Sequence, residues 1–159
     1  MIEVNSSSPA PDGLVRAIGG AVMRWQDATQ AYDEAVGERL QLNAAERRCL
    51  AFLHAGPRPA GAIAEETGLT PAAVTALIDR MEARGLLQRT RSAEDRRKVM
   101  VENTDAVEML TAPYYRPIAE EGAGFLATFS AEEQAVLLRF LEGATALQQK
   151  HLAALRFSP

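Results

Sequence analysis

Several ingredients of common functional sites are scarce in this 159-residue chain. It has one cysteine and two histidines, so it can form no internal disulfide and offers few soft metal ligands. His54 and His151 stand far apart, outside any metal-binding spacing, and no glycine-rich phosphate loop is present. Paired glutamates such as Glu65–Glu66 are typical of solvated helix faces. These absences predict a protein that is not an enzyme and that holds no metal and no cofactor.

Long apolar runs and a secretory leader are also missing. No stretch approaches the roughly 20 apolar residues that a membrane span requires. The N-terminal segment has neither a basic start nor an apolar centre, and its Ser and Pro content predicts a loose tail over residues 1–12. Together with the lone cysteine, this favours a cytoplasmic protein without a membrane partner. With 47% hydrophobic residues, the chain can bury one proper core.

Positive charge is scarce overall but concentrated in one segment. The formal net charge is −4, whereas the segment 89–98 holds five basic and two acidic residues, a local charge of about +3: Arg89, Arg91, Glu94, Asp95, Arg96, Arg97 and Lys98. Short runs at Leu87–Arg91 and Lys98–Glu102 are predicted to pair around it as a basic β-hairpin. The positive charge of this segment is more informative than the net charge of the chain, because a solvated hairpin without a binding partner does not require a cluster of basic residues.

The residues before this hairpin have the pattern of a helix-turn-helix. A short helix is predicted up to Thr67, where Gly68 ends it in a left-handed conformation. Thr70 is a natural N-cap for the next helix, and Pro71 suits its first position. The apolar face of that second helix recurs at three- and four-residue spacing: Val74, Leu77, Ile78 and Met81. Small residues dominate the opposite face, which favours close entry into a groove.

A helix-turn-helix followed by a basic wing is an arrangement that grips duplex DNA, with the second helix in the major groove. Candidate DNA contacts come from the start of the second helix and from the wing: Thr70, Pro71, Ala72, Ala73, Thr75, Ala76, Arg80, Arg91, Asp95, Arg96, Arg97 and Lys98. The hydroxyl and methyl of Thr75 are candidates for contacting base edges. The alternative is a winged-helix module whose basic wing serves an acidic protein partner.

Two long amphipathic helices flank this segment. The first carries an apolar stripe: Leu14, Ile18, Val22, Trp25, Thr29, Tyr32 and Val36. The last opens with a capping box at Ser130–Glu133 and carries a second stripe: Leu137, Phe140, Leu141, Ala144, Leu147, Leu152 and Leu155. A helix after Thr104 is expected to be interrupted near Pro113 and Pro117. The stripes suit packing within one chain or between two copies, and their length favours a homodimer.

The segments Val74–Leu87 and Asp95–Val101 resemble the recognition helix and the wing signature of the MarR family of bacterial transcriptional regulators. The resemblance, weaker over the rest of the chain, implies a mainly α fold with a small β-wing. It implies a winged helix-turn-helix DNA-binding lobe at residues 41–103 and dimerisation helices at 13–40 and 104–157. It also implies that Asp95 braces the wing through an ion pair and that Arg97 enters the minor groove. Ala76 and Asn103–Thr104 depart from the family pattern, which usually has a larger polar residue and Leu-Thr there.

The same resemblance implies that the activity of the protein is regulated by a ligand or by oxidation. The commoner switch in the family is a small-molecule effector bound where the dimerisation helices meet the DNA-binding lobe. Trp25, Tyr32, Tyr114 and Tyr115 are candidates for holding a planar aromatic effector, although Trp25 and Tyr32 suit the apolar stripe equally well. Cys49 has apolar neighbours, which argues for an unactivated thiol and leaves redox sensing as the less favoured alternative.

The prediction is therefore a ligand-responsive transcriptional repressor. It would bind a double-stranded, pseudo-palindromic operator as a homodimer and be released by a small aromatic effector.

Overall fold

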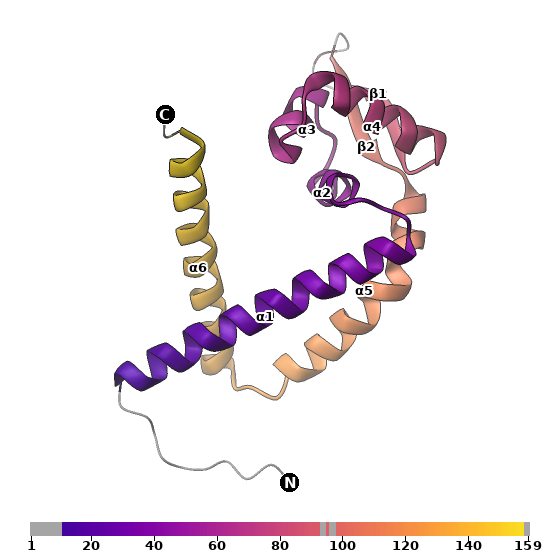
Figure 1. The fold of residues 1–159 in the computed structure, drawn as a ribbon. Helices are drawn as coiled ribbons and strands as arrows, with labels where there is room; N and C mark the ends of the chain where they lie inside the picture. The colour runs from indigo at the N-terminus through magenta and orange to yellow at the C-terminus, as the bar shows by residue number, and fades with distance from the viewer. Residues whose placement is uncertain (1–10, 93–94, 96–97, 158–159) are drawn as a thin grey trace. The chain divides into compact units, whose positions relative to one another are not determined.

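The protein is mainly helical with one small antiparallel sheet. The computed structural model describes residues 11–92, 95 and 98–157. Their order is α1 (Pro11–Arg39), α2 (Ala44–Leu53), α3 (Ala60–Thr67), α4 (Pro71–Ala83), β1 (Leu87–Arg91), β2 (Val99–Asn103), α5 (Asp105–Leu126) and α6 (Ala131–Phe157) (Figure 1). The predicted fold class, helices with a small β-wing, is confirmed. The chain divides into two compact units, residues 1–111 and 112–159.

The core of the first unit lies between the short helices and the hairpin. The apolar face predicted for α4 is fully turned inward, because Val74, Leu77, Ile78 and Met81 are each at most 2% exposed. It meets Cys49, Leu50 and Leu53 of α2, Ile63 of α3, and Leu87 and Val101 of the strands. Three- and four-residue spacing aligns such side chains on one side of a helix. The helix-turn-helix is therefore held by its own apolar core.

The ends of the short helices follow from local chemistry. Gly68 ends α3 with a φ of 69°, a conformation that costs glycine little. Thr70 then caps α4 by accepting a hydrogen bond from Ala73 N at 3.3 Å, with Pro71 as the first helical residue. Asn43 and Glu46 form a reciprocal capping box at the start of α2. The predictions for Gly68, Thr70 and Pro71 are confirmed.

The wing is a two-stranded antiparallel hairpin in which Leu87 pairs with Asn103 and Arg91 with Val99. The second strand was predicted at Lys98–Glu102, and this prediction is wrong by one residue. Lys98 belongs to the turn instead, because its N–H donates to Asp95 O at 2.9 Å. A further bridge joins Arg58 to Val101, so the loop between α2 and α3 extends the sheet on the far side of β2.

Helix α5 runs without a break through Pro113 and Pro117, where the sequence predicts an interruption. This prediction is wrong: each proline lacks a backbone N–H donor, but the helix continues on both sides of the two positions. The two prolines are four residues apart, so they share one side of the helix, and both are exposed. Helix α5 is thus one element of 22 residues.

The long terminal helices bury little apolar surface. α1 begins at Pro11, inside the segment predicted as a tail, and spans 29 residues, while α6 spans 27. The capping box predicted for α6 is confirmed, with Ser130 N donating to Glu133 Oε2 at 2.8 Å and Glu133 N to Ser130 Oγ at 3.2 Å. On α1, Leu14 and Ile18 are 50% and 43% exposed, and only Val36, near its end, reaches the core. No helix in the described part of the chain has the length and apolar character needed to cross a membrane.

Candidate nucleic-acid interface

The exposed side of α4 is made of small residues. Ala72, Thr75 and Ala76 face outward, directly opposite the buried apolar face. Thr70, Pro71 and Arg80 are exposed as well, whereas Ala73 is half-buried. A helix with short side chains on its outer face allows its backbone to approach another surface closely. The structure therefore places the predicted helix residues together on one accessible surface.

The hydroxyl of Thr75 already has a partner within α4. It donates to Pro71 O at 3.0 Å, so its proton is not available to an outside acceptor. Its oxygen lone pairs and its methyl group remain on the exposed side. Thr75 is therefore equipped to accept a hydrogen bond from a base amino group or to contact a thymine methyl.

The Arg80 guanidinium is bound to the protein through one nitrogen, while the side chain as a whole remains partly exposed to solvent. Its Nε donates to Glu46 Oε1 at 2.8 Å, although the Arg80 side chain is half exposed. Glu46 is only 3% exposed, and its second oxygen accepts from Asn43 N at 2.8 Å. A buried carboxylate needs such partners, because an unpaired charge is costly away from water. Arg80 thus has a structural role that the sequence did not reveal.

Arg89 is less available than its place in the basic segment suggests. Its guanidinium forms ion pairs with Asp79, at 2.6 Å, and with Glu82, both on α4. The backbone N–H of Arg89 also donates to Glu82 Oε1 at 3.0 Å. Two carboxylates therefore compensate this cation and join the first strand of the wing to α4. The positive charge that the wing offers to a partner must come from its other residues.

The described residues of the wing keep part of the predicted basic surface. Arg91 on β1 and Lys98 before β2 are both exposed, and Asp95 is half-buried. The turn is closed by Ser92 N, which donates to Lys98 O at 3.0 Å. Arg96 and Arg97 lie outside the described residues. The ion pair expected of Asp95 and the minor-groove role expected of Arg97 stay predictions.

The Asn103–Thr104 pair at the base of the wing, where the family usually has Leu-Thr, forms hydrogen bonds through both side chains. Asn103 Nδ2 donates to Leu50 O at 3.0 Å and so ties β2 to α2. The Thr104 hydroxyl donates to Gly85 O at 2.6 Å, next to the end of α4. These two hydrogen bonds join the base of the wing to α2 and to the residue that follows α4.

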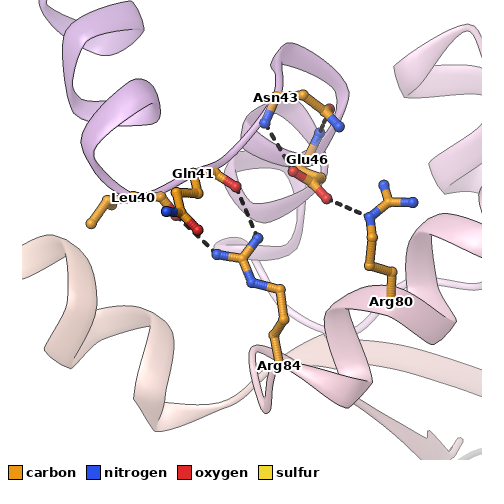
Figure 2. A network of polar contacts seen from close by, with 6 residues as sticks. All are labelled: Leu40, Gln41, Asn43, Glu46, Arg80 and Arg84. Atoms are coloured by element: carbon orange, nitrogen blue, oxygen red, sulfur yellow. Dashed lines mark hydrogen bonds and ion pairs between the residues drawn. The ribbon is translucent and has the colours of Figure 1, made fainter.

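A network that sequence reasoning missed joins the end of α4 to the turn between α1 and α2 (Figure 2). Arg84 donates to Leu40 O at 2.9 Å and to Gln41 O at 3.0 Å, beside the pair of Arg80 with Glu46. The one sequence signal was the Asn43-x-x-Glu46 spacing of a capping box. That signal predicts a helix start but not the arginines that meet it.

Cys49 lies in the core and is fully buried. Burial in apolar surroundings, with a smaller contribution from the nearby carboxylate of Glu46, raises the pKa of the Cys49 thiol from 9.0 to about 11. At neutral pH the thiol is therefore protonated, and a protonated, inaccessible thiol is a poor nucleophile. The structure gives no support to a redox role for Cys49.

The four aromatic residues predicted for an effector pocket belong to different units. Trp25 and Tyr32 lie on α1 in the first unit, 58% and 36% exposed, while Tyr114 and Tyr115 lie on α5 in the second. The pocket stays a prediction. Among the described residues, no three His, Cys, Asp or Glu side chains gather in a way that could hold a metal ion. His54 ends α2 as its C-cap residue.

A helix-turn-helix followed directly by a two-stranded hairpin defines the winged helix-turn-helix class. Residues 40–98, which hold α2, α3, α4 and the first strand of the hairpin, match the model of the MarR family. Over this segment the chain is similar to the MarR family of bacterial transcriptional regulators.

Individual relatives agree with this assignment. The chain is 28% identical over 129 residues to the uncharacterised HTH-type transcriptional regulator YcgE of Bacillus subtilis, covering 80% of this chain and 84% of YcgE. The crystal structure of YusO from Bacillus subtilis is 25% identical with a TM-score of 0.55, covering 89% of this chain and 99% of YusO. The transcriptional repressor CouR, solved on a 23-mer DNA duplex, is 26% identical with a TM-score of 0.50, covering 87% of this chain and 99% of CouR.

Proposed function

We propose that this protein is a DNA-binding repressor that binds a pseudo-palindromic operator as a homodimer and is released by a small aromatic effector. The observation that carries the DNA-binding part is the exposed small-residue surface of α4 beside the basic wing. An α-helix fits the major groove of B-DNA, and short side chains on its outer face let it enter deeply. The relative CouR, bound to a DNA duplex, supports this reading.

The two parts of the surface have different tasks in this proposal. Thr75 and its neighbours on α4 contact base edges and so select the sequence. Lys98 and Arg91 contact phosphates, which adds affinity without sequence choice. The pairing of Arg89 with Asp79 and Glu82 holds the wing against α4, so that both parts meet the duplex in one orientation.

The homodimer is supported by the apolar side chains that the terminal helices leave exposed. On α6, Phe140 and Leu141 are each 42% exposed and Leu147 is 57% exposed, although all three belong to one predicted stripe. A stripe of this length costs free energy in water and is stabilised by a partner surface. A second copy of the chain supplies the same stripe, and its two-fold symmetry matches a pseudo-palindromic operator.

The first experiment selects duplexes from a random pool with the full-length protein and measures affinity for the selected operator and for random DNA at several salt concentrations. We expect strong preference for the operator and a steep decrease of affinity with salt. Lys98→Ala should weaken both complexes and reduce the salt slope by about 0.9 for each phosphate that the lysine neutralises, or about twice that for a dimer. Lys150→Ala, which removes an exposed lysine of α6, is the matched control and should change neither.

Two results would contradict the DNA-binding proposal. If no duplex is enriched and affinity for DNA does not depend on salt, the winged helix serves a protein partner instead. If Lys98→Ala and Lys150→Ala behave alike, the wing does not contact the phosphate backbone.

The effector part needs its own test. A thermal-shift screen of phenolic carboxylates and related aromatics should give compounds that also release the operator. A tenfold release requires about 1.4 kcal/mol of differential affinity between the free and DNA-bound states. Trp25→Ala and Tyr115→Ala should abolish the response and leave DNA affinity unchanged. A full response in both variants would place the effector site elsewhere, and a screen without any hit would refute an aromatic effector.

A further inference from the structure

The C-terminal end of the recognition helix α4 is fastened to the turn that follows α1. Arg84, the residue after the last turn of α4, donates from Nη1 to Gln41 O at 3.0 Å and from Nη2 to Leu40 O at 2.9 Å. Figure 2 shows the two terminal nitrogens of one guanidinium reaching two successive carbonyl groups. Gly85 follows at once with a φ of 71°, so the chain turns away toward β1 and leaves Arg84 at the end of α4.

The accepting carbonyls belong to the two residues that directly follow α1. α1 ends at Arg39, and carbonyls of its last turn already accept hydrogen bonds from the backbone N–H groups of residues 40–42, so Arg84 binds the turn just beyond the helix. The C-terminal end of a helix also carries partial negative charge, which attracts a cation. Gln41 adopts a φ of 53°, a left-handed conformation that is uncommon for a residue with a side chain. The Arg84 guanidinium, which comes from the end of α4, therefore binds the turn at the C-terminal end of α1.

Two further arginines contact the same region. One turn before Arg84, Arg80 is paired with the buried Glu46, which also closes the cap of α2 through Asn43 N. On another side, the Arg47 side chain lies against Gly37, where an added Cβ would stand 2.6 Å from Arg47 Cδ. Arg47 Nη1 also reaches Leu42 O at 3.5 Å. The end of α1, the start of α2 and the end of α4 are thus joined at one place.

We propose that Arg84 is a positioning residue that sets the angle between α1 and the recognition helix, and thereby the spacing of operator half-sites that the dimer accepts. The inference rests on the proposed function, in which α1 contributes to the dimer and α4 reads DNA. If the dimer fixes the two copies of α1, then each α4 is placed through its attachment to α1. The Arg84 fork is the direct hydrogen-bonded link between the end of α4 and the end of α1.

A planar fork is better suited to this task than a single charge. Two parallel donors on two neighbouring carbonyls restrict rotation about the contact, whereas a lysine ammonium binds as a point and leaves the angle less defined. Arg84→Ala removes both hydrogen bonds, and Arg84→Lys keeps the charge without the fork. Arg39→Ala is the matched control, because it removes an exposed arginine from the last turn of α1.

The experiment measures affinity for a series of duplexes built from the operator selected by the wild-type protein. One base pair is inserted or removed at the centre, which shifts one half-site by about 3.4 Å and rotates it by about 35°. We expect the wild type and Arg39→Ala to lose at least tenfold in affinity on either change. Arg84→Ala should lose less than about threefold, with Arg84→Lys between them, and all four proteins should share one salt slope.

The informative quantity is the ratio of the affinity for the operator to the affinity for each altered duplex. This ratio distinguishes a positioning role of Arg84 from simple destabilisation of the protein. A destabilised variant loses affinity by the same factor on every duplex, and this result in Arg84→Ala would overturn the proposal. An unchanged wild-type ratio in Arg84→Ala would overturn it as well. If Arg84→Ala does not fold, the ratio measured for Arg84→Lys decides. A wild type that does not distinguish the operator from random DNA would instead refute the proposed function on which the inference rests.

Discussion

The winged-helix lobe and the long terminal helices carry similar apolar patterns but bury them to opposite extents. Every buried apolar residue in the described part of the chain lies between Val36 and Val107. The stripe of α4 is almost completely covered, whereas most residues of the α6 stripe are exposed. Figure 1 shows how the lobe achieves this, since α2, α3 and α4 gather beside the hairpin of β1 and β2.

Periodicity therefore identifies a face to be buried without naming its partner. The three-and-four spacing of Val74, Leu77 and Ile78 on α4 is the same kind of signal as that of Phe140, Leu141 and Leu147 on α6. In the lobe, neighbouring segments of the same chain cover the face. The exposed face of α6 is the reason to propose a second copy of the chain.

The largest expected effect comes from a charge placed in the exposed stripe. Leu141→Asp should raise the dimer dissociation constant at least a hundredfold, because an unpaired carboxylate would be buried in each half of the interface, at about 3 kcal/mol or more each. Light scattering after size exclusion should show the mass falling from about twice the 17.2 kDa chain mass to the chain mass. Ala146→Asp adds the same charge to the opposite, exposed side of α6 and should leave the dimer intact. A wild type that is monomeric at micromolar concentration would contradict the proposed dimer.

A substitution in the core of the lobe tests whether its buried apolar residues stabilise the fold more than the exposed apolar residues of α6 do. Ile63→Ala removes a fully buried side chain of the lobe and should lower the free energy of unfolding by about 3 kcal/mol. Leu138→Ala removes a side chain of α6 that is 58% exposed and lies off the stripe, and it should cost no more than about 0.5 kcal/mol. Urea unfolding at a single protein concentration measures both. A similar decrease in the free energy of unfolding for the two variants would mean that the hydrophobic core does not lie in the lobe.

The reactivity of Cys49 reports how tightly the lobe is closed. A pKa raised from 9.0 to about 11 reduces the thiolate fraction at pH 7 about a hundredfold, and burial adds to the protection. Because the pKa is raised, reactivity should increase as the pH passes 9 toward 11. Alkylation by iodoacetamide at pH 7, followed by mass spectrometry, should be at least about a hundredfold slower in the folded protein than in urea. Equal rates would contradict a closed core and reopen the redox alternative.

The smallest expected effect distinguishes the two parts of the proposed DNA-binding surface. Thr75→Val keeps the methyl group and removes the oxygen, so the preference for operator over random duplex should fall about fivefold, or about 1 kcal/mol. The salt slope should not change, because the substitution removes no group that neutralises a phosphate. Thr145→Val is the matched control, since the Thr145 hydroxyl makes the same kind of bond within α6, to Leu141 O at 2.8 Å. Equal losses on operator and random DNA would show that Thr75 does not read bases.

Local sequence was sufficient to define the order of the elements and the ends of the short helices around the turn, although not the start of α1 or the continuity of α5. Gly68, Thr70 and Pro71 act within a few residues of their own positions, through a left-handed turn, a side-chain cap and a fixed φ. The Ser130–Glu133 capping box is equally local. The apolar face of α4 was predictable too, because helical geometry alone aligns its residues. The position of β2 failed by one residue because Lys98 hydrogen-bonds within the turn, and turn bonding is poorly encoded in strand propensity.

Which charges remain available, and how the recognition helix is held, depend on the packing of segments that are distant in sequence. Arg89 belongs to the basic wing by its position in the chain, but Asp79 and Glu82 on α4 compensate its charge. Arg80 meets Glu46 across 34 residues of sequence, and Arg84 meets Leu40 O across 44. A pairing at that separation depends on how the helices close on one another. The periodicity of one segment describes its own geometry, so it carries no information about which distant segment will supply the opposite charge or the free carbonyl.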